Sequence, residues 1–155
     1  MSATDTMPGQ TEVAPGPGET TGSCLCGAVG FAFSDTFGIF QYCFCSRCRK
    51  ATGSAFAANM LVPPEAFRWT RGEDLVGTFP LADARHFATG FCKSCGSALP
   101  WRGQTGRAVV VPAGALDDVP PLRPGQNVHV ASRAPWYAEP MELPSFDHLP
   151  PKKRG

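Results

Sequence analysis

The stretch QYCFCSRCRKATGSAF (residues 41–56) places three cysteines within six residues, Cys43, Cys45 and Cys48. Structural zinc sites usually have four protein ligands, whereas catalytic zinc usually has three protein ligands and an open fourth position. The C-x-C-x-x-C spacing packs three thiolates onto one loop. The stretch therefore predicts a self-contained zinc site with three cysteine ligands.

The other four cysteines form two closely spaced pairs, one in SCLCG and one in FCKSCGS. A glycine follows each pair, at a place where a ligand turn often requires a positive φ. Combining the pairs predicts a closed, tetrahedral structural zinc site that ties an early strand to a late one. Its ligands are Cys24, Cys26, Cys92 and Cys95, and the glycines are Gly27 and Gly96.

Seven cysteines are an odd number, and the short spacings favour metal ligation over a disulfide framework. For the three-cysteine stretch, two alternatives remain open. One is a fourth ligand from His86, His129 or His148, with His129 expected in a strand. The other is a redox or metal-storage role for the thiols.

Short segments of alternating apolar residues predict a mainly β fold with antiparallel sheets. In AVGFAF, for example, Val29, Phe31 and Phe33 share one face. Seventeen glycines and sixteen prolines supply the many turns, and no helical period exceeds a turn or two. Single helical turns are expected in PPEAF and GALDDV. The expected strands are 28–33, 37–42, 55–62, 67–70, 75–79, 85–91, 106–114 and 127–132.

A length of 155 residues predicts one domain. Residues 1–21 are rich in Thr, Pro, Gly and Glu and are expected to form a disordered N-terminal tail. The zinc domain is expected over 22–149, and residues 150–155 form a short C-terminal tail.

The net charge of +1 gives no electrostatic reason to expect a nucleic-acid partner. The longest apolar runs are far shorter than a membrane helix requires, so no membrane association is expected. The N-terminal stretch lacks both a basic region and an apolar core, which argues against a secretory signal. These features predict a cytoplasmic protein.

The segments GSCLCGAVGF, CFCSRCRKATGSAF, FCKSCGSALPW, GALDD and NVHVASRAPW resemble the glutathione-dependent formaldehyde-activating enzyme family. The resemblance spans roughly residues 22–146 and implies antiparallel sheets around zinc in an Mss4-like fold. It assigns a structural zinc to the four paired cysteines and a second zinc, where the substrate thiol is handled, to Cys43, Cys45 and Cys48. The family also includes centromere protein V-like proteins. Phe44 departs from the family, which usually has a histidine there.

Three thiolate ligands suit thiol chemistry, because an anionic, sulfur-rich zinc is a weak Lewis acid that holds a soft thiolate well. The sequence therefore predicts a zinc-dependent carbon–sulfur lyase acting on a thiol–aldehyde adduct such as S-hydroxymethyl-glutathione. The substrate thiol, glutathione or another small thiol, would be the fourth ligand. Arg47 is expected to bind an anionic substrate, and Phe44 and Trp136 are expected to wall the pocket, although Trp136 could equally be a core residue. The alternative is a non-enzymatic, zinc-stabilised binding module.

Overall fold

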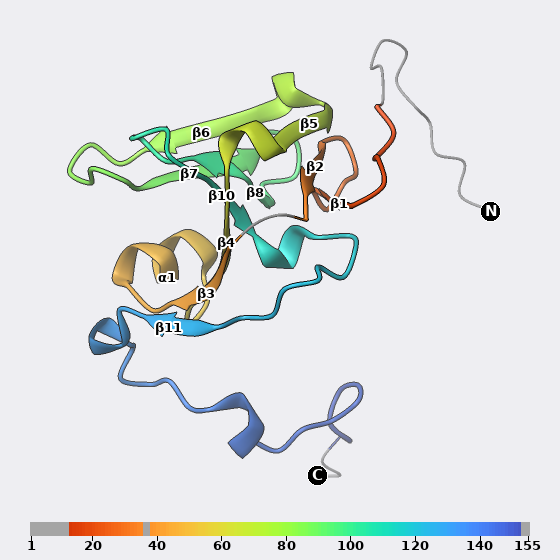
Figure 1. Cartoon of the computed structure of the whole chain (residues 1–155). Helices are drawn as coiled ribbons and strands as arrows, with labels where there is room; N and C mark the ends of the chain where they lie inside the picture. The colour runs from red at the N-terminus through yellow and green to blue at the C-terminus, as the bar shows by residue number, and fades with distance from the viewer. Residues whose placement is uncertain (1–12, 36–37, 153–155) are drawn as a thin grey trace.

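The computed structural model describes residues 13–35 and 38–152, and across them it has three small β-sheets, one α-helix and several single 3-10 turns (Figure 1). The first sheet has the order β1 (Glu19–Ser23), β2 (Gly30–Ser34), β5 (Phe67–Arg71). The second has the order β11 (Gln126–Val128), β3 (Ile39–Cys43), β4 (Ala57–Val62), β10 (Val109–Pro112), β9 (Trp101–Arg102). The third has the order β6 (Val76–Pro80), β7 (Ala88–Cys92), β8 (Ala98–Leu99). The helix α1 (Ser46–Thr52) lies beside β3 and β4. The 3-10 turns are η1 (Pro64–Ala66), η2 (Glu73–Leu75), η3 (Ala113–Ala115), η4 (Val130–Ser132) and η5 (Pro140–Glu142).

The mainly β prediction is confirmed, and each predicted strand overlaps an observed one. Pairing is antiparallel in all three sheets except between β11 and β3, which run parallel. The predicted single turns correspond to η1 and η3.

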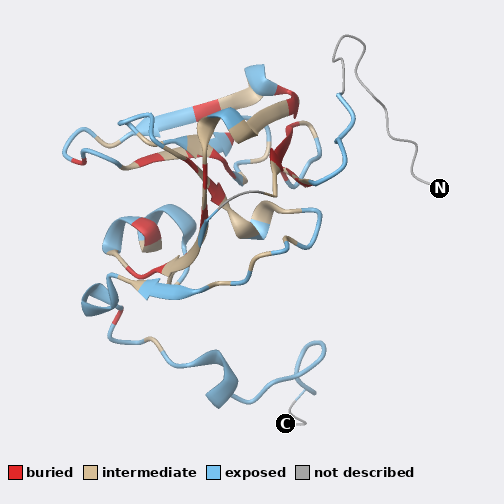
Figure 2. Cartoon of the chain, in the orientation of Figure 1, coloured by how far each residue is buried: buried red, intermediate tan, exposed pale blue. Residues whose placement is uncertain are grey.

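The hydrophobic core draws on all three sheets, and its buried residues colour the ribbon red in Figure 2. Val29, Phe31 and Phe33 are fully buried, as the alternation in AVGFAF predicts. Phe31 packs against both aromatic rings of β5, with ring centroids 6.0 Å from Phe67 and 6.2 Å from Trp69. Such aromatic pairs stabilise a core beyond the area they bury.

The predicted N-terminal tail is wrong for residues 19–21, because β1 begins at Glu19. Residues 1–12 lie outside the described part. β1 escaped the prediction because its sequence, ETTGS, is polar, although it pairs with the next strand, β2, and distant side chains hydrogen-bond to it. Asp118 accepts hydrogen bonds from both the N–H and the hydroxyl of Thr21, at 2.9 and 2.5 Å, and the buried Thr20 hydroxyl donates to Asp35 at 2.6 Å.

The predicted strand at 127–132 is also wrong in its second half. β11 ends at Val128, and His129 adopts a left-handed conformation with φ of 55° before a 3-10 turn. His129 is exposed and is therefore not a strand residue facing the core. Beyond this turn the chain leaves the sheets as an arm whose residues are mostly exposed (Figures 1 and 2).

Among residues 13–35 and 38–152, no helix combines the length and apolar character needed to cross a membrane.

Candidate metal centres

Two hairpin turns from different sheets bring Cys24, Cys26, Cys92 and Cys95 together as one group, the four-cysteine cluster. Cys24 and Cys26 lie in the turn between β1 and β2, whereas Cys92 is the last residue of β7 and Cys95 lies in the turn that leads to β8. The Sγ atoms of Cys24 and Cys26 are 3.5 Å apart, and those of Cys26 and Cys92 are 4.0 Å apart. Tetrahedral zinc with Zn–S bonds of about 2.3 Å requires S···S distances of about 3.8 Å. The cluster therefore fits a structural zinc ion.

The glycine after each pair has the conformation that the sequence predicts. Gly27 has φ of 77° and Gly96 has φ of 74°, both in the left-handed region that side chains disfavour. Each glycine N–H donates to the carbonyl of the first cysteine of its pair, at 2.9 Å for Cys24 and 2.8 Å for Cys92. These turns fold both sulfurs of a pair toward the same point.

Hydrogen bonds from polar groups favour the thiolate form of two residues in the four-cysteine cluster, Cys24 and Cys95. The Ser97 hydroxyl lies 3.2 Å from the sulfur of Cys95, and this contact, with the Ser97 backbone, lowers the pKa of Cys95 to about 6. The Val29 N–H donates to the sulfur of Cys24 at 3.3 Å. Ser97 also accepts from the N–H of Leu25 at 3.0 Å, which ties one hairpin turn to the other. Contacts of this kind orient metal ligands.

The three-cysteine cluster, Cys43, Cys45 and Cys48, lies where β3 ends and α1 begins, and its sulfurs are all within 4.8 Å of one another. The sequence predicted that the three residues lie on one loop, and this is wrong. Cys43 is the last residue of β3, Cys45 is the N-cap of α1, and Cys48 lies in the helix. The Cys45 sulfur accepts from the N–H of Cys48 at 3.4 Å, so the same sulfur that could bind a metal also caps the helix. This arrangement fixes three sulfurs on two regular elements.

The three-cysteine cluster is largely shielded from water. Cys43 and Cys48 are each 7% exposed, and burial raises the pKa of both thiols. Buried thiols of this kind become good metal ligands when a cation offsets the cost of their negative charge. Asn59 points its side-chain amide toward the sulfur of Cys48, with Nδ2 at 4.0 Å.

Among the described residues, neither cluster includes a histidine. His86, His129 and His148 all lie in the described part of the chain and are exposed. The alternative of a histidine as fourth ligand to the three-cysteine cluster therefore finds no support in this conformation.

The three predicted substrate-binding residues differ in how far their side chains are buried. Phe44 is buried at 4% exposure and packs on Phe56 and Tyr137, with ring centroids 5.2 and 5.4 Å away. Trp136 is 69% exposed, so its reading as a core residue is wrong. Arg47 is exposed on α1, whereas the neighbouring Arg49 is half-buried, and its Nε has no hydrogen-bond partner among the described residues.

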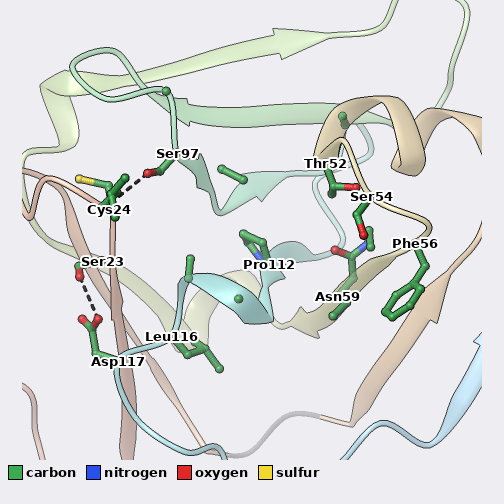
Figure 3. Close-up of a pocket in the computed structure, with 18 residues that line it drawn as sticks. Ser23, Cys24, Thr52, Ser54, Phe56, Asn59, Ser97, Pro112, Leu116 and Asp117 are labelled. Carbon is green, nitrogen blue, oxygen red and sulfur yellow. Dashed lines mark hydrogen bonds between the residues drawn. The ribbon is translucent and has the colours of Figure 1, made fainter. Parts of the chain in front are cut away.

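Two adjoining pockets lie between the cysteine clusters, and one of them borders the three-cysteine cluster. The proximal pocket, of about 220 Å³, has Cys48 in its wall, and the large pocket, of about 820 Å³, reaches from α1 to Cys24. Figure 3 shows the large pocket with Cys24 and Ser97 on one side and Thr52, Ser54 and Asn59 on the other. Phe44, Arg47 and Trp136 line neither pocket. The pockets share the lining residues Ala51, Thr52, Ala57, Asn59, Gly96, Ala98 and Pro112.

Apart from Cys48, the residues that line the proximal pocket were not predicted from the sequence. Asn59 carried one usable signal, because an amide in the middle of the apolar strand AFAANMLV calls for a partner. Phe87 and Trp101, whose ring centroids are 5.5 Å apart, have no feature in the sequence that indicates a pocket. They belong to separate segments, and only the fold brings them beside Cys48.

Comparisons with known proteins place the chain in a family. Residues 19–132 match the sequence profile of a family described as glutathione-dependent formaldehyde-activating enzyme. The crystal structure of a Rhodobacter sphaeroides protein superposes with a TM-score of 0.53 at 25% identity, covering 69% of this chain and 98% of that one. No curated protein matches the chain.

Proposed function

The chain belongs to the glutathione-dependent formaldehyde-activating enzyme family, and from that premise we propose that it is a zinc-dependent carbon–sulfur lyase acting on a thiol–aldehyde adduct. One observation carries the proposal. A cluster of only three cysteines adjoins a pocket, and one of its members, Cys48, forms part of the pocket wall. Three protein ligands with access for a fourth are typical of catalytic zinc, whereas the four-cysteine cluster is closed.

Each group in the cluster has a definite part in the proposed reaction. Cys43, Cys45 and Cys48 would hold the zinc ion, which supplies a site where a thiol binds as its thiolate. The Asn59 amide, beside Cys48 and in the walls of both pockets, is placed to orient the bound adduct by hydrogen bonding. The shielding of the cluster keeps competing water away from the sulfur.

The reaction balances without an oxidant or a reductant. In the lyase direction the C–S bond of the adduct breaks, and its electron pair stays on sulfur. The adduct hydroxyl loses its proton to solvent as its O–H electrons form the aldehyde C=O bond. In the reverse direction the thiolate attacks the aldehyde carbon, and solvent returns the proton to oxygen.

The same proposal includes two zinc ions per chain, a structural one at the four-cysteine cluster and a second at the three-cysteine cluster, in an Mss4-like arrangement of sheets. It also takes the protein to be cytoplasmic, with a small-molecule thiol or thiol adduct as partner and with neither nucleic acid nor membrane. The two separate sulfur clusters and the family membership support it.

Cobalt substitution tests the proposed function directly. With cobalt in place of zinc, adding glutathione or another small thiol should change the thiolate charge-transfer and d–d bands of the three-cysteine cluster. The Cys48→Ser variant serves as the matched control and should show no thiol-dependent change. If no thiol alters the spectrum of the native sequence, both metal centres are structural and the domain is a binding module instead.

A further inference from the structure

The two pockets beside Cys48 indicate what kind of thiol the site accepts. We infer that the organic group on the substrate sulfur is compact, apolar and uncharged, about the size of a phenyl ring or a butyl chain, and that it sits in the proximal pocket. This inference rests on the proposed function and narrows its substrate to small apolar thiols and their aldehyde adducts.

The size and lining of the proximal pocket set the size and polarity of the group. Apart from Cys48, most of the residues that line it are apolar, among them Phe87, Leu99 and Trp101, and the polar ones, Thr52, Asn59 and Thr89, are uncharged. Its volume is about 220 Å³. An apolar cavity of about 150 Å³ is enough for a benzene molecule. A group of phenyl size therefore fits, whereas a peptide does not.

The charges in the walls disfavour an anionic thiol such as glutathione, which carries two carboxylates. Among the described residues that line the two pockets, only Asp117 is charged, and it is an acid. Asp117 accepts a hydrogen bond from the Ser23 hydroxyl at 3.0 Å, at the far side of the large pocket from Asn59 (Figure 3). A carboxylate of glutathione next to Asp117 would meet a like charge, and no cationic residue among the described lining residues would offset it. Arg47, the predicted partner of an anionic substrate, lines neither pocket.

The position of Phe44 is consistent with a site that accepts apolar, uncharged thiols. It fills its position with an aromatic ring packed between Phe56 and Tyr137 and offers no polar atom to a ligand. Phe56 itself lines the large pocket. The large pocket thus adjoins an apolar aromatic group that includes Phe44.

The first test is a titration of the cobalt-substituted protein with a graded series of thiols. Ethanethiol, propanethiol and butanethiol should bind in rising order, each methylene tightening the half-saturation concentration about fourfold. Benzyl mercaptan should bind more tightly than 2-mercaptoethanol by tenfold or more, and octanethiol should gain little over butanethiol because the pocket is full. Glutathione should be the weakest ligand.

The second test fills the pocket. Thr89, on β7, lines the proximal pocket only, and Thr89→Phe should abolish the advantage of benzyl mercaptan over 2-mercaptoethanol. Thr78→Phe is the matched control, because Thr78 is exposed on the neighbouring strand β6 and lines neither pocket. This variant should bind the whole series of thiols as the native sequence does. Should Thr89→Phe fail to fold, Ala51→Leu, at an exposed position of α1 that lines both pockets, replaces it.

The outcomes separate the two claims. If glutathione binds more tightly than benzyl mercaptan, or if the alkyl series is flat, the proposed function stands and this inference is overturned. If filling the proximal pocket leaves the preference for apolar thiols intact, the apolar group sits elsewhere and the inference is again overturned. If no thiol changes the cobalt bands, both fall together.

Discussion

The sulfurs of Cys26 and Cys92 lie 4.0 Å apart, although 66 positions separate the two residues in the chain. One sulfur comes from the turn after β1, in the first sheet, and the other from the end of β7, in the third. A metal ion at the four-cysteine cluster would therefore join two sheets. The three-cysteine cluster, by contrast, joins only β3 to the helix that follows it.

This contrast predicts different consequences for losing one cysteine from each cluster. Structural zinc contributes an apparent free energy of roughly 10–16 kcal/mol in small zinc folds, whereas whole domains are stable by only about 5–15 kcal/mol. Cys92→Ser should therefore unfold or aggregate. Cys48→Ser should stay soluble and folded and retain one zinc ion, because its cluster constrains little loop-closure entropy. Circular dichroism and metal analysis of both variants decide this, and equal collapse of the two would contradict the open-site mechanism.

Metal content gives a second prediction. The protein purified under reducing conditions should carry two zinc ions per chain in native mass spectrometry, one for each cluster. A weak chelator should remove one ion before the other, because three protein ligands hold zinc less firmly than four. The ion that remains should be the one whose loss unfolds the protein. A reproducible content of one ion, or of iron, would argue against two zinc sites.

Asp118 should stabilise the first sheet through its two hydrogen bonds with Thr21. Since the carboxylate is exposed and solvent screens it, Asp118→Ala should cost about 1 kcal/mol, a fall in Tm of about 2–4 °C. Asp117→Ala is the matched control, because within residues 13–35 and 38–152 that side chain accepts a single hydrogen bond, from the Ser23 hydroxyl, and it should cost less. Thermal unfolding followed by circular dichroism measures both, and equal losses would assign the effect to charge alone.

Acid should weaken the ion pair between Glu19 and Arg68, whose closest N···O distance is 2.8 Å. Hydrogen bonding from Arg68, with a further bond from the Gly16 N–H, lowers the pKa of Glu19 below its ordinary value of 4.5. The folded state thus binds this proton less readily than the unfolded state. The pair's stabilisation is complete above about pH 4.5 and is lost as the pH falls through the lower folded pKa.

Glu19→Gln should consequently lower Tm slightly at pH 7, by an amount corresponding to less than about 1 kcal/mol because both side chains are partly exposed. Its Tm should then fall less than that of the native sequence between pH 5 and pH 3. Glu65→Gln, at an exposed carboxylate in η1, is the control. Thermal scans across this range are the measurement, and parallel pH profiles for all three proteins would rule out the assignment.

Phe44→His restores the residue usual in the family, and it tests whether Phe44 has become part of the packing. The imidazole would sit between Phe56 and Tyr137, at a position with 4% exposure, and its polar atoms would lose their water. A loss of about 1–3 kcal/mol is expected, with both zinc ions retained. Phe44→Leu, which stays apolar, should cost less than Phe44→His if polarity is the cause. Chemical denaturation compares them, and an unchanged midpoint for Phe44→His would show that the site tolerates the polar ring.

The sequence by itself determined the ligand groups and the β character of the chain. Short spacings such as C-x-x-C confine two sulfurs to one turn, so the grouping of Cys92 with Cys95 is a local property, and Gly96 has the positive φ that this turn requires. The alternation of Val29, Phe31 and Phe33 likewise identified a buried strand, because strand side chains alternate between two faces. Family membership followed from the same local motifs.

Only the tertiary structure decided what surrounds the three-cysteine cluster. The polar strand β1 has no apolar alternation, and the carboxylates that hydrogen-bond to it, Asp117 and Asp118, come from nearly a hundred residues away. The local sequence pattern therefore could not identify β1 as a strand. Trp136 and Phe44 look alike as aromatic residues in the sequence, yet one is exposed and the other buried. The pocket beside Cys48 is assembled from α1, β4 and the segments around β7, β8 and β10. Burial and pocket shape depend on such long-range contacts, which the spacing of residues along the chain does not encode.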